Sequence, residues 1–224
     1  MPAQPLQTSP RPDDIELVQR IASRGEGAFE MLMRRYNRML FRVARAILKD
    51  DAEAEEALQD AYLAVYAHIG EFQGRARLST WITRIVINQA LMRSRKQRRD
   101  RVIVPLPTAL ETLQPAASGF DVPASGQESP ESATMRAEIR HLLEAQIDRL
   151  PVAFRAVFIL REVEDLSVGE TAECLGIPEA TVRTRLFRAK ALLREALARE
   201  IDLAAANVFG FAGERCDRIV AAVR

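Results

Sequence analysis

Histidine and cysteine are scarce in this sequence. Its 224 residues include two of each, and they lie far apart: His68, His141, Cys174 and Cys216. A structural zinc site needs four such ligands close together, and a catalytic centre needs a convergent set of acid, base or nucleophile. We therefore predict no metal, no cofactor and no enzymatic activity, and we expect both cysteines to be free thiols.

Long hydrophobic runs are also missing. No uninterrupted apolar segment approaches the roughly 18 to 20 residues of a membrane span, and the first twenty residues lack the basic-then-apolar order of a secretory signal. We expect a cytoplasmic protein. The net charge is only +1, from 32 basic and 31 acidic residues, so the position of the charges is more informative than their sum.

Helical periodicity is present on both sides of a proline-rich stretch. Residues 102–134 contain five prolines, four acidic residues and no basic residue, a composition typical of a linker. On either side, apolar residues recur at steps of three and four, and no alternating run indicates a strand. We predict an all-α protein with two small helical domains joined by a flexible acidic linker. The predicted boundaries are an N-terminal polar segment 1–24, a first domain 25–101, the linker 102–134, a second domain 135–200 and a C-terminal extension 201–224.

The second domain carries the pattern of a helix-turn-helix. Ser167 and Glu170 have the spacing of a capping box at a helix start. Small and apolar residues follow at the relative offsets 0, 4, 5 and 10 that the motif needs: Ala172, Gly176, Ile177 and Val182. The helix after the turn is basic, as a helix in the major groove must be to contact phosphates and base edges. We predict base contacts for Arg183, Thr184, Phe187 and Arg188.

A second basic run ends the last helix of the first domain. Six cations and one acidic residue occupy residues 93–101. The helix follows a loop with two glycines, and aromatic and amide groups lie beside the cations: Phe72, Gln73, Arg75, Trp81 and Asn88. Such groups hold unstacked bases against a charged groove, so the segment is a candidate single-strand DNA surface. Trp81 fits a core position equally well.

An acidic stretch lies earlier in the first domain. Five carboxylates occur between residues 51 and 60 without a cation, on a helix whose other face is apolar. DNA repels such a surface, which therefore either faces solvent or docks on a basic partner protein.

Taken together, these segments resemble the extracytoplasmic-function (ECF) sigma factors, small bacterial transcription-initiation subunits of the sigma-70 family with two sigma domains. The resemblance covers about residues 25 to 197 and depends on segments 51–62, 72–88 and 150–190. It implies contacts to core RNA polymerase from Asp51, Glu55, Gln59 and Asp60. It further implies that residues 72–99 recognise and melt the minus-ten promoter element, with phosphates held by Arg93, Arg95, Arg98 and Arg99. The basic helix of the second domain would read the minus-thirty-five element.

The partners that the resemblance implies are core RNA polymerase, promoter DNA and, as for many relatives, an anti-sigma factor. A stand-alone helix-turn-helix regulator is the alternative, and it predicts stable duplex binding by the free protein. The sigma-factor interpretation alone explains the acidic helix, the second basic helix and the linker together. Residues 1–12 and the C-terminal extension show no motif of the family.

Overall fold

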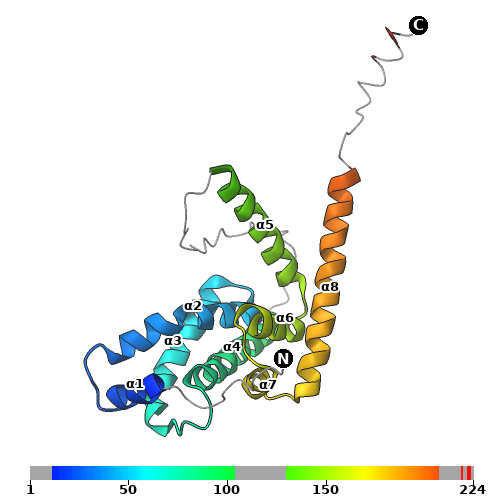
Figure 1. The fold of residues 1–224 in the computed structure, drawn as a ribbon. Coiled ribbons are helices and arrows are strands. Elements are labelled where there is room, and N and C mark those ends of the chain that lie inside the picture. Colours follow the sequence, from blue (N-terminus) through cyan, green and yellow to red (C-terminus); the bar gives the residue numbers. More distant parts are fainter. Residues whose placement is uncertain (1–11, 104–129, 207–217, 219–220, 223–224) are drawn as a thin grey trace, which may run out of the picture.

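The computed structural model describes residues 12–103, 130–206, 218, 221 and 222, and within these ranges all regular structure is helical (Figure 1). The prediction of an all-α protein is confirmed. Most of the predicted linker and of the C-terminal extension, including Cys216, falls outside the described residues. The helices of the first domain are α1 (Pro12–Ala22), α2 (Ala28–Leu48), α3 (Asp51–His68), the 3-10 turn η1 (Ile69–Glu71) and α4 (Leu78–Ile103). Those of the second are α5 (Pro130–Arg149), α6 (Val152–Phe158), the π-helical turn η2 (Ile159–Val163), α7 (Val168–Leu175) and α8 (Glu179–Ala206).

The first domain is built around α2, α3 and α4, each of which packs against the other two. Asp50 starts α3, because its carboxylate accepts a hydrogen bond from the backbone N–H of Glu53 at 2.9 Å. Alanines on the inner face of α3 let the helices approach closely, and fully buried aliphatic side chains fill the space around them: Leu32, Leu40, Val65, Ile82 and Val86. The three helices thus share one continuous, closely packed core that stabilises the domain.

Helix α1 belongs to this domain, although it lies within the predicted N-terminal segment 1–24. Its buried residues Leu17, Val18 and Ile21 form one apolar face that joins the core. Buried Asp14 accepts hydrogen bonds from the hydroxyl of Tyr36 and the guanidinium of Arg35, both at 3.2 Å. Helix α1, which precedes the predicted start of the domain at residue 25, thus packs onto the same core.

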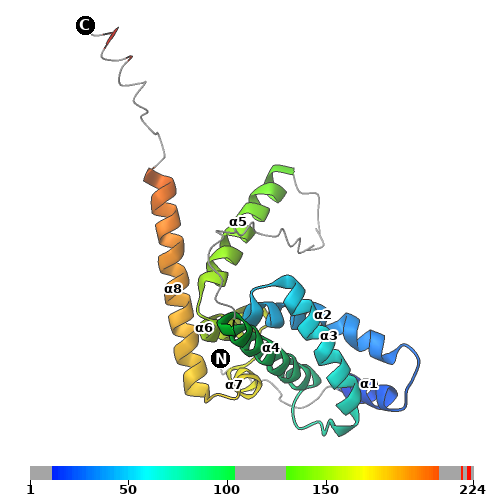
Figure 2. The ribbon, with the colours of Figure 1, turned by 180° about the vertical axis from the view of Figure 1, so that it is seen from behind.

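The second domain has a smaller core of its own. Leu150, Ala189 and Leu193 are its buried centre, with Phe154 and Phe158 packed beside them. Helix α5 meets α8 near its C-terminal end, and the two helices then diverge (Figures 1 and 2). The part of α5 that lies away from α8 carries four exposed apolar residues: Met135, Ile139, Leu142 and Leu143.

The predicted helix-turn-helix is present as α7, a tight turn and α8. Ser167 and Glu170 form the capping box, with bonds of 3.1 and 2.8 Å between side chain and backbone. Gly176 ends α7 with a φ of 63°, a left-handed conformation that glycine adopts without steric cost. Val182 is fully buried at the crossing of the two helices.

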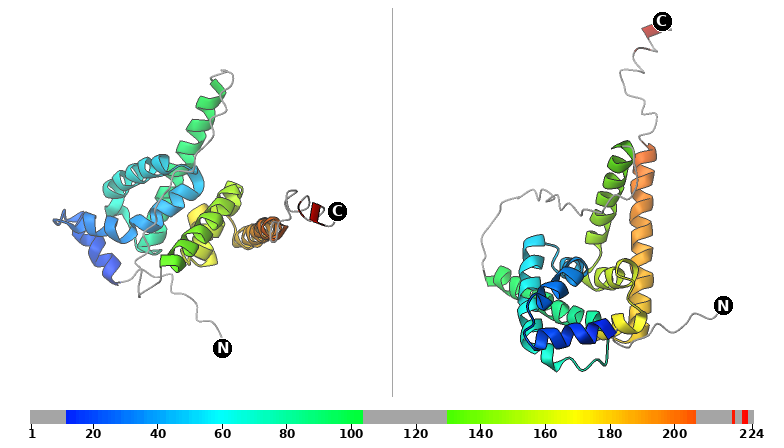
Figure 3. Two further views of the ribbon diagram at one scale, coloured as in Figure 1. Left: turned by 90° about the horizontal axis from the view of Figure 1, so that it is seen from above. Right: turned by 60° about the vertical axis from the view of Figure 1, so that its left-hand side comes forward.

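The two domains pack directly against each other. Helix α7 lies along α4, and α6 lies against α2, as the views in Figures 2 and 3 show. A second hydrophobic cluster is shared between the domains and includes Val43, Ile47 and Ile87 from the first and Leu160, Leu166 and Cys174 from the second. Among the described residues, no helix is long and apolar enough to cross a membrane.

Candidate polymerase and DNA surfaces

The predicted base-contacting residues share the exposed face at the start of α8. Arg183, Thr184, Phe187 and Arg188 are all exposed, and the Phe187 ring is 72% exposed although it is apolar. Val182 and Ala189 point the opposite way into the core. Burial of one face thus fixes which side chains the helix presents outward.

A hollow of about 310 Å³ lies beside these residues, between α6 and α8. Thr184 and Arg188 line it together with four residues that the sequence analysis did not select: Phe154, Ala180, Thr181 and Arg185. Thr184, Arg185 and Arg188 lie three, four and seven residues after Thr181, a spacing that places all four along one helical face. This spacing could have been recognised in the sequence. Arg183 is held by Glu179 one turn earlier at 2.6 Å, and the Thr184 hydroxyl donates to the Ala180 carbonyl at 2.9 Å.

The loop before α4 and the first turn of that helix bring two predicted aromatic residues together. The Phe72 and Trp81 rings meet edge to face with their centres 5.6 Å apart, and both lie partly buried against the first core. Trp81 therefore has a packing role, whichever other role it has. Gln73 and Arg75 in the loop are exposed, as is Asn88 about two turns further along α4.

A second hollow, of about 450 Å³, lies along the middle of α4. It is lined by the predicted residues Asn88 and Arg95 and by further side chains that the sequence analysis did not select: Ile85, Gln89, Leu91 and Met92. Met92 is 53% exposed. The C-terminal part of α4 projects away from the body of the domain (Figure 3). The backbone of Arg98 and Arg99 lies in this part, and their side chains are outside the described residues.

Arg93, the first cation of the basic run, faces α3. Its Nε donates to Glu53 at 2.6 Å, Nη1 to Asp60 at 2.9 Å and Nη2 to Glu56. The Arg93 side chain is 24% exposed. Three carboxylates therefore neutralise this charge and tie the acidic helix to the basic one.

The predicted polymerase-contacting residues divide into two groups. Asp51, Glu55 and Gln59 recur every four residues and share one face of α3, whereas Asp60 belongs to the cluster around Arg93. Asp51 is paired with Arg45 at 2.6 Å. Glu55 and Gln59 are exposed.

Comparison with known proteins identifies the folds of both domains. Residues 32–100 match the family model of sigma-70 region 2, and residues 140–193 match that of sigma-70 region 4. The ECF RNA polymerase sigma factor SigM of Mycobacterium tuberculosis is 33% identical over 185 residues, which cover 82% of this chain and 84% of SigM. The RNA polymerase sigma-H factor of Pseudomonas aeruginosa is 32% identical over 186 residues, covering 82% and 93% of the two chains.

Solved structures agree with this assignment at the level of the fold. CnrH, in complex with the cytosolic domain of CnrY, superposes with a TM-score of 0.56 at 21% identity and covers 83% of this chain and 97% of its own. The Bartonella quintana sigma factor RpoE, crystallised with the anti-sigma factor NepR, has a TM-score of 0.57 at 18% identity, covering 77% and 98%.

The chain belongs to the ECF sigma factors of the sigma-70 family. It is a transcription-initiation factor, which binds core RNA polymerase and promoter DNA and directs promoter recognition and melting. These matches cover both domains, and they do not favour the alternative of a stand-alone regulator.

Proposed function

We propose that three separate surfaces carry the work of this sigma factor. The exposed face of α3 docks on core polymerase, the loop before α4 and its basic end take the minus-ten element, and the start of α8 reads the minus-thirty-five element. The protein acts in the cytoplasm without enzymatic activity of its own. The observation that carries the proposal is the separation of one acidic face from two basic ones.

The polymerase contact consists of Asp51, Glu55, Gln59 and Asp60. Exposed carboxylates on a rigid helix fit a basic helical partner, because complementary charge speeds association and excludes wrong partners. Asp51 and Asp60 are already paired within the chain, with Arg45 and Arg93 respectively. Glu55 and Gln59 therefore provide the more accessible part of this surface.

The minus-ten contact uses the aromatic pair Phe72 and Trp81 as a rigid wall for the loop, and it uses Gln73, Arg75 and Asn88 for polar contacts. An extruded base gives up stacking worth a few kcal/mol, which contacts in a pocket must offset. Arg95, Arg98 and Arg99 on the projecting end of α4 hold phosphates. We assign Arg93 a positioning role, since its charge is engaged by α3.

The minus-thirty-five contact uses Arg183, Thr184, Phe187 and Arg188, with Arg185 added from the hollow beside them. An exposed aromatic ring next to two guanidinium groups fits a thymine methyl group and the acceptor edge of guanine. We further propose that the domains predicted at 25–101, extended by helix α1, and at 135–200 form the two functional units, joined by the acidic linker. We also propose that an anti-sigma factor binds them, because the structurally similar RpoE was crystallised in complex with one.

The test is co-elution with bacterial core RNA polymerase in gel filtration at moderate salt. We expect the wild-type chain to co-elute and Glu55→Lys to bind about tenfold more weakly, because it reverses an exposed charge at the contact. Glu16→Lys makes the same charge change on an exposed residue of α1 and should bind as the wild type does. Equal binding by both variants would contradict the α3 assignment.

A further inference from the structure

An apolar stripe runs along the part of α5 that lies away from α8. Its members recur at steps of three and four and are 39 to 64% exposed: Met135, Ile139, Leu142 and Leu143. Further along the same face, Leu150 is buried in one cluster with Ala189 and Leu193 of α8. The stripe therefore continues a core-facing surface beyond the point where α8 covers it. Contiguous exposed apolar surface of this kind marks an interaction site.

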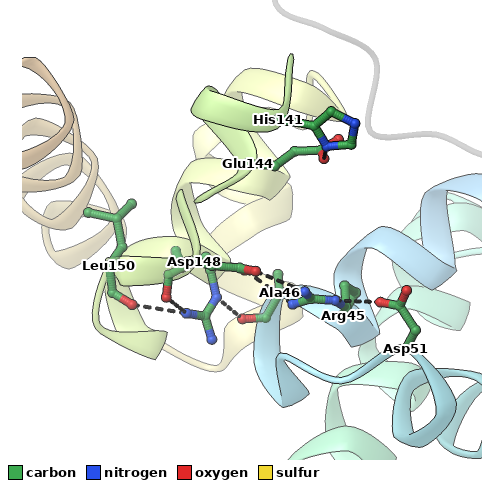
Figure 4. Close-up of polar contacts among 8 residues, drawn as sticks. Arg45, Ala46, Asp51, His141, Glu144, Asp148 and Leu150 are labelled. Carbon is green, nitrogen blue, oxygen red and sulfur yellow. Dashed lines mark hydrogen bonds and ion pairs between the residues drawn. The ribbon is translucent and has the colours of Figure 1, made fainter. Parts of the chain in front are cut away.

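The opposite face of α5 is polar and is directed toward the first domain. Asp148 contacts Arg45 of α2 at 2.8 Å. One and two turns earlier on this face, Glu144 and His141 lie together, with 3.8 Å between carboxylate and ring nitrogen (Figure 4). Helix α5 thus has one face engaged with charged partners and one apolar face without cover among the described residues.

The C-terminal end of α5 is fixed in its orientation by Arg155. The side chain of Arg155 is fully buried. Its Nη1 donates to the carbonyls of Asp148 and Leu150 at 2.9 and 3.0 Å, and its Nε donates to the carbonyl of Ala46 at the end of α2 (Figure 4). Rotation of α5 about its own axis would break these bonds. The apolar stripe can therefore be covered only by a segment that comes to it.

The tail, residues 207–224, begins beside this stripe. Gln146 of α5 donates to Glu200 of α8 at 3.0 Å, near the point where the two helices separate (Figures 1 and 2). Helix α8 continues six residues beyond Glu200, or about 9 Å at 1.5 Å per residue. Because α5 and α8 are antiparallel, the end of α8 lies level with the middle of the stripe.

The sequence of the tail contains an apolar face that matches the stripe. Four apolar residues have the i, i+3, i+4, i+7 spacing of a helix that docks on an apolar surface: Cys216, Ile219, Val220 and Val223. Residues 207–217 lie outside the described residues. The described tail residues are helical and exposed: Arg218, Ala221 and Ala222. These three fall on the opposite face of the same helix.

The lengths of the tail and the stripe also agree. A helix over residues 214–224 is about 16 Å long, and the stripe from residue 135 to residue 143 is about 12 Å long. Residues 207–213 include Gly210 and Gly213, which are typical of a turn. Seven residues span up to about 23 Å, so this connection is long enough for the chain to reach α5 from the end of α8.

We propose that residues 214–224 form an amphipathic helix that docks on the apolar stripe of α5 and completes the core of the second domain. The tail is the occupant, rather than a second copy or another protein, because a short tether gives it a millimolar effective concentration at the stripe. Even a weak contact is then occupied in the free chain. The docked tail protects the stripe from contact with other apolar surfaces.

Disulfide trapping in the full-length chain tests this contact. Cys216 belongs to the docking face of the tail, and Leu142→Cys places a second thiol on the stripe. His141→Cys is the matched control, because the neighbouring position has the same tether but lies on the polar face of α5 (Figure 4). With oxidised glutathione, we expect the intramolecular disulfide to form at least about tenfold faster for Leu142→Cys, because the bond requires Cα atoms within about 7 Å. Peptide mapping identifies the joined thiols. Equal rates, or no disulfide in either chain, would overturn the proposal.

Two substitutions in the tail of the Leu142→Cys chain provide the second readout. Val220→Asp places a charge on the docking face and should slow trapping at least about fivefold, whereas Ala222→Asp on the opposite face should leave the rate unchanged. Circular dichroism checks that both variants are equally helical. The same rate in both variants would overturn the proposal, as would a covalent dimer as the main product, since a second copy would then occupy the stripe. These measurements use neither polymerase nor DNA, so their outcome is independent of the Glu55→Lys test.

Discussion

The first domain is stabilised mainly by its own hydrophobic core, whereas the second domain depends largely on contacts with the first domain and on helix caps. In the first, three long helices share one core that α1 extends. In the second, a few residues make the private core, and Leu160, Leu166 and Cys174 are buried against the first domain. Both domains are helical, but the first is stabilised mainly by packing, whereas the second also depends on a capping box, a glycine turn and a buried arginine.

This difference fits the separate tasks of the two domains. A large core keeps the loop and the aromatic pair of the proposed minus-ten surface in a fixed geometry, which base extrusion would require. The second domain has the smaller core of its own, so we expect it to be the less stable of the two by itself.

The largest expected effect concerns the Cys174 thiol, which belongs to the second domain but lies against the first. Burial, followed by the nearby Glu173 and Glu170, raises its pKa from 9.0 to about 12. In a Cys216→Ser background at pH 8, we expect alkylation by iodoacetamide to be at least about a hundredfold slower in the native chain than in urea, because the thiolate is the reactive form. Adding Arg42→Glu, which removes the ion pair of Arg42 with Glu164 of the second domain, should accelerate the native reaction. An unchanged native rate would mean that the second domain alone buries the thiol.

Truncating the two cores should have unequal effects. Leu32 is fully buried in the first core, and Leu32→Ala should lower the free energy of unfolding by about 3 kcal/mol, whereas Leu193→Ala should cost about 2 kcal/mol. The single tryptophan, Trp81, reports on the first domain. Urea unfolding followed by its fluorescence should shift for Leu32→Ala and stay nearly unchanged for Leu193→Ala. An equal shift would show that the two domains unfold as one unit.

The two proposed DNA surfaces should respond differently to loss of a cation. Arg188→Ala should cost about 2 kcal/mol on promoters with the preferred base at its contact and less on others. Arg95→Ala should weaken open-complex formation on all promoters alike and reduce the salt dependence by about one charge. Transcription from promoters varied in the minus-thirty-five element, at several salt concentrations, measures both effects. Identical profiles for the two variants would contradict the division into base reading and phosphate holding.

Loss of one N-cap should be the smallest effect. Ser167→Ala and Asp50→Ala each remove the side chain that caps a helix start, and each should cost about 1 kcal/mol. Because the second domain has the smaller core, we expect Ser167→Ala to lower the thermal midpoint of its own domain more than Asp50→Ala lowers that of the first. Circular dichroism of the full chain, compared with Trp81 fluorescence, separates the two transitions. The reverse order would show that α7 is held mainly by α4.

Local patterns allowed much of this structure to be predicted. The helical periods, the capping box at Ser167 and the turn at Gly176 each depend on residues within one or two helical turns. The exposure of Arg188 and its neighbours follows from the burial of Val182 on the opposite face. Such features can be predicted without knowing which distant segments of the chain pack against them.

Contacts between distant segments could not be predicted in the same way. Arg93 meets carboxylates that lie 33 to 40 residues earlier in the chain, and a run of cations does not reveal which of its members turns inward. Val43 and Ile47 continue the apolar pattern of α2, but the pattern does not state that the second domain covers them. Helix α1 was missed because its short apolar face follows a proline-rich start.

The bonds of Arg155 have a consequence for mutational scanning. Its acceptors are main-chain carbonyls, at Ala46, Asp148 and Leu150, so exchanging the side chains at those positions leaves the acceptor atoms in place. An alanine scan of α2 leaves residue 46 unchanged, because it is already alanine, and would overlook one of the anchoring points between the domains. Ala46 is buried, so a larger side chain there would crowd its neighbours, but only a substitution of Arg155 removes the donor itself.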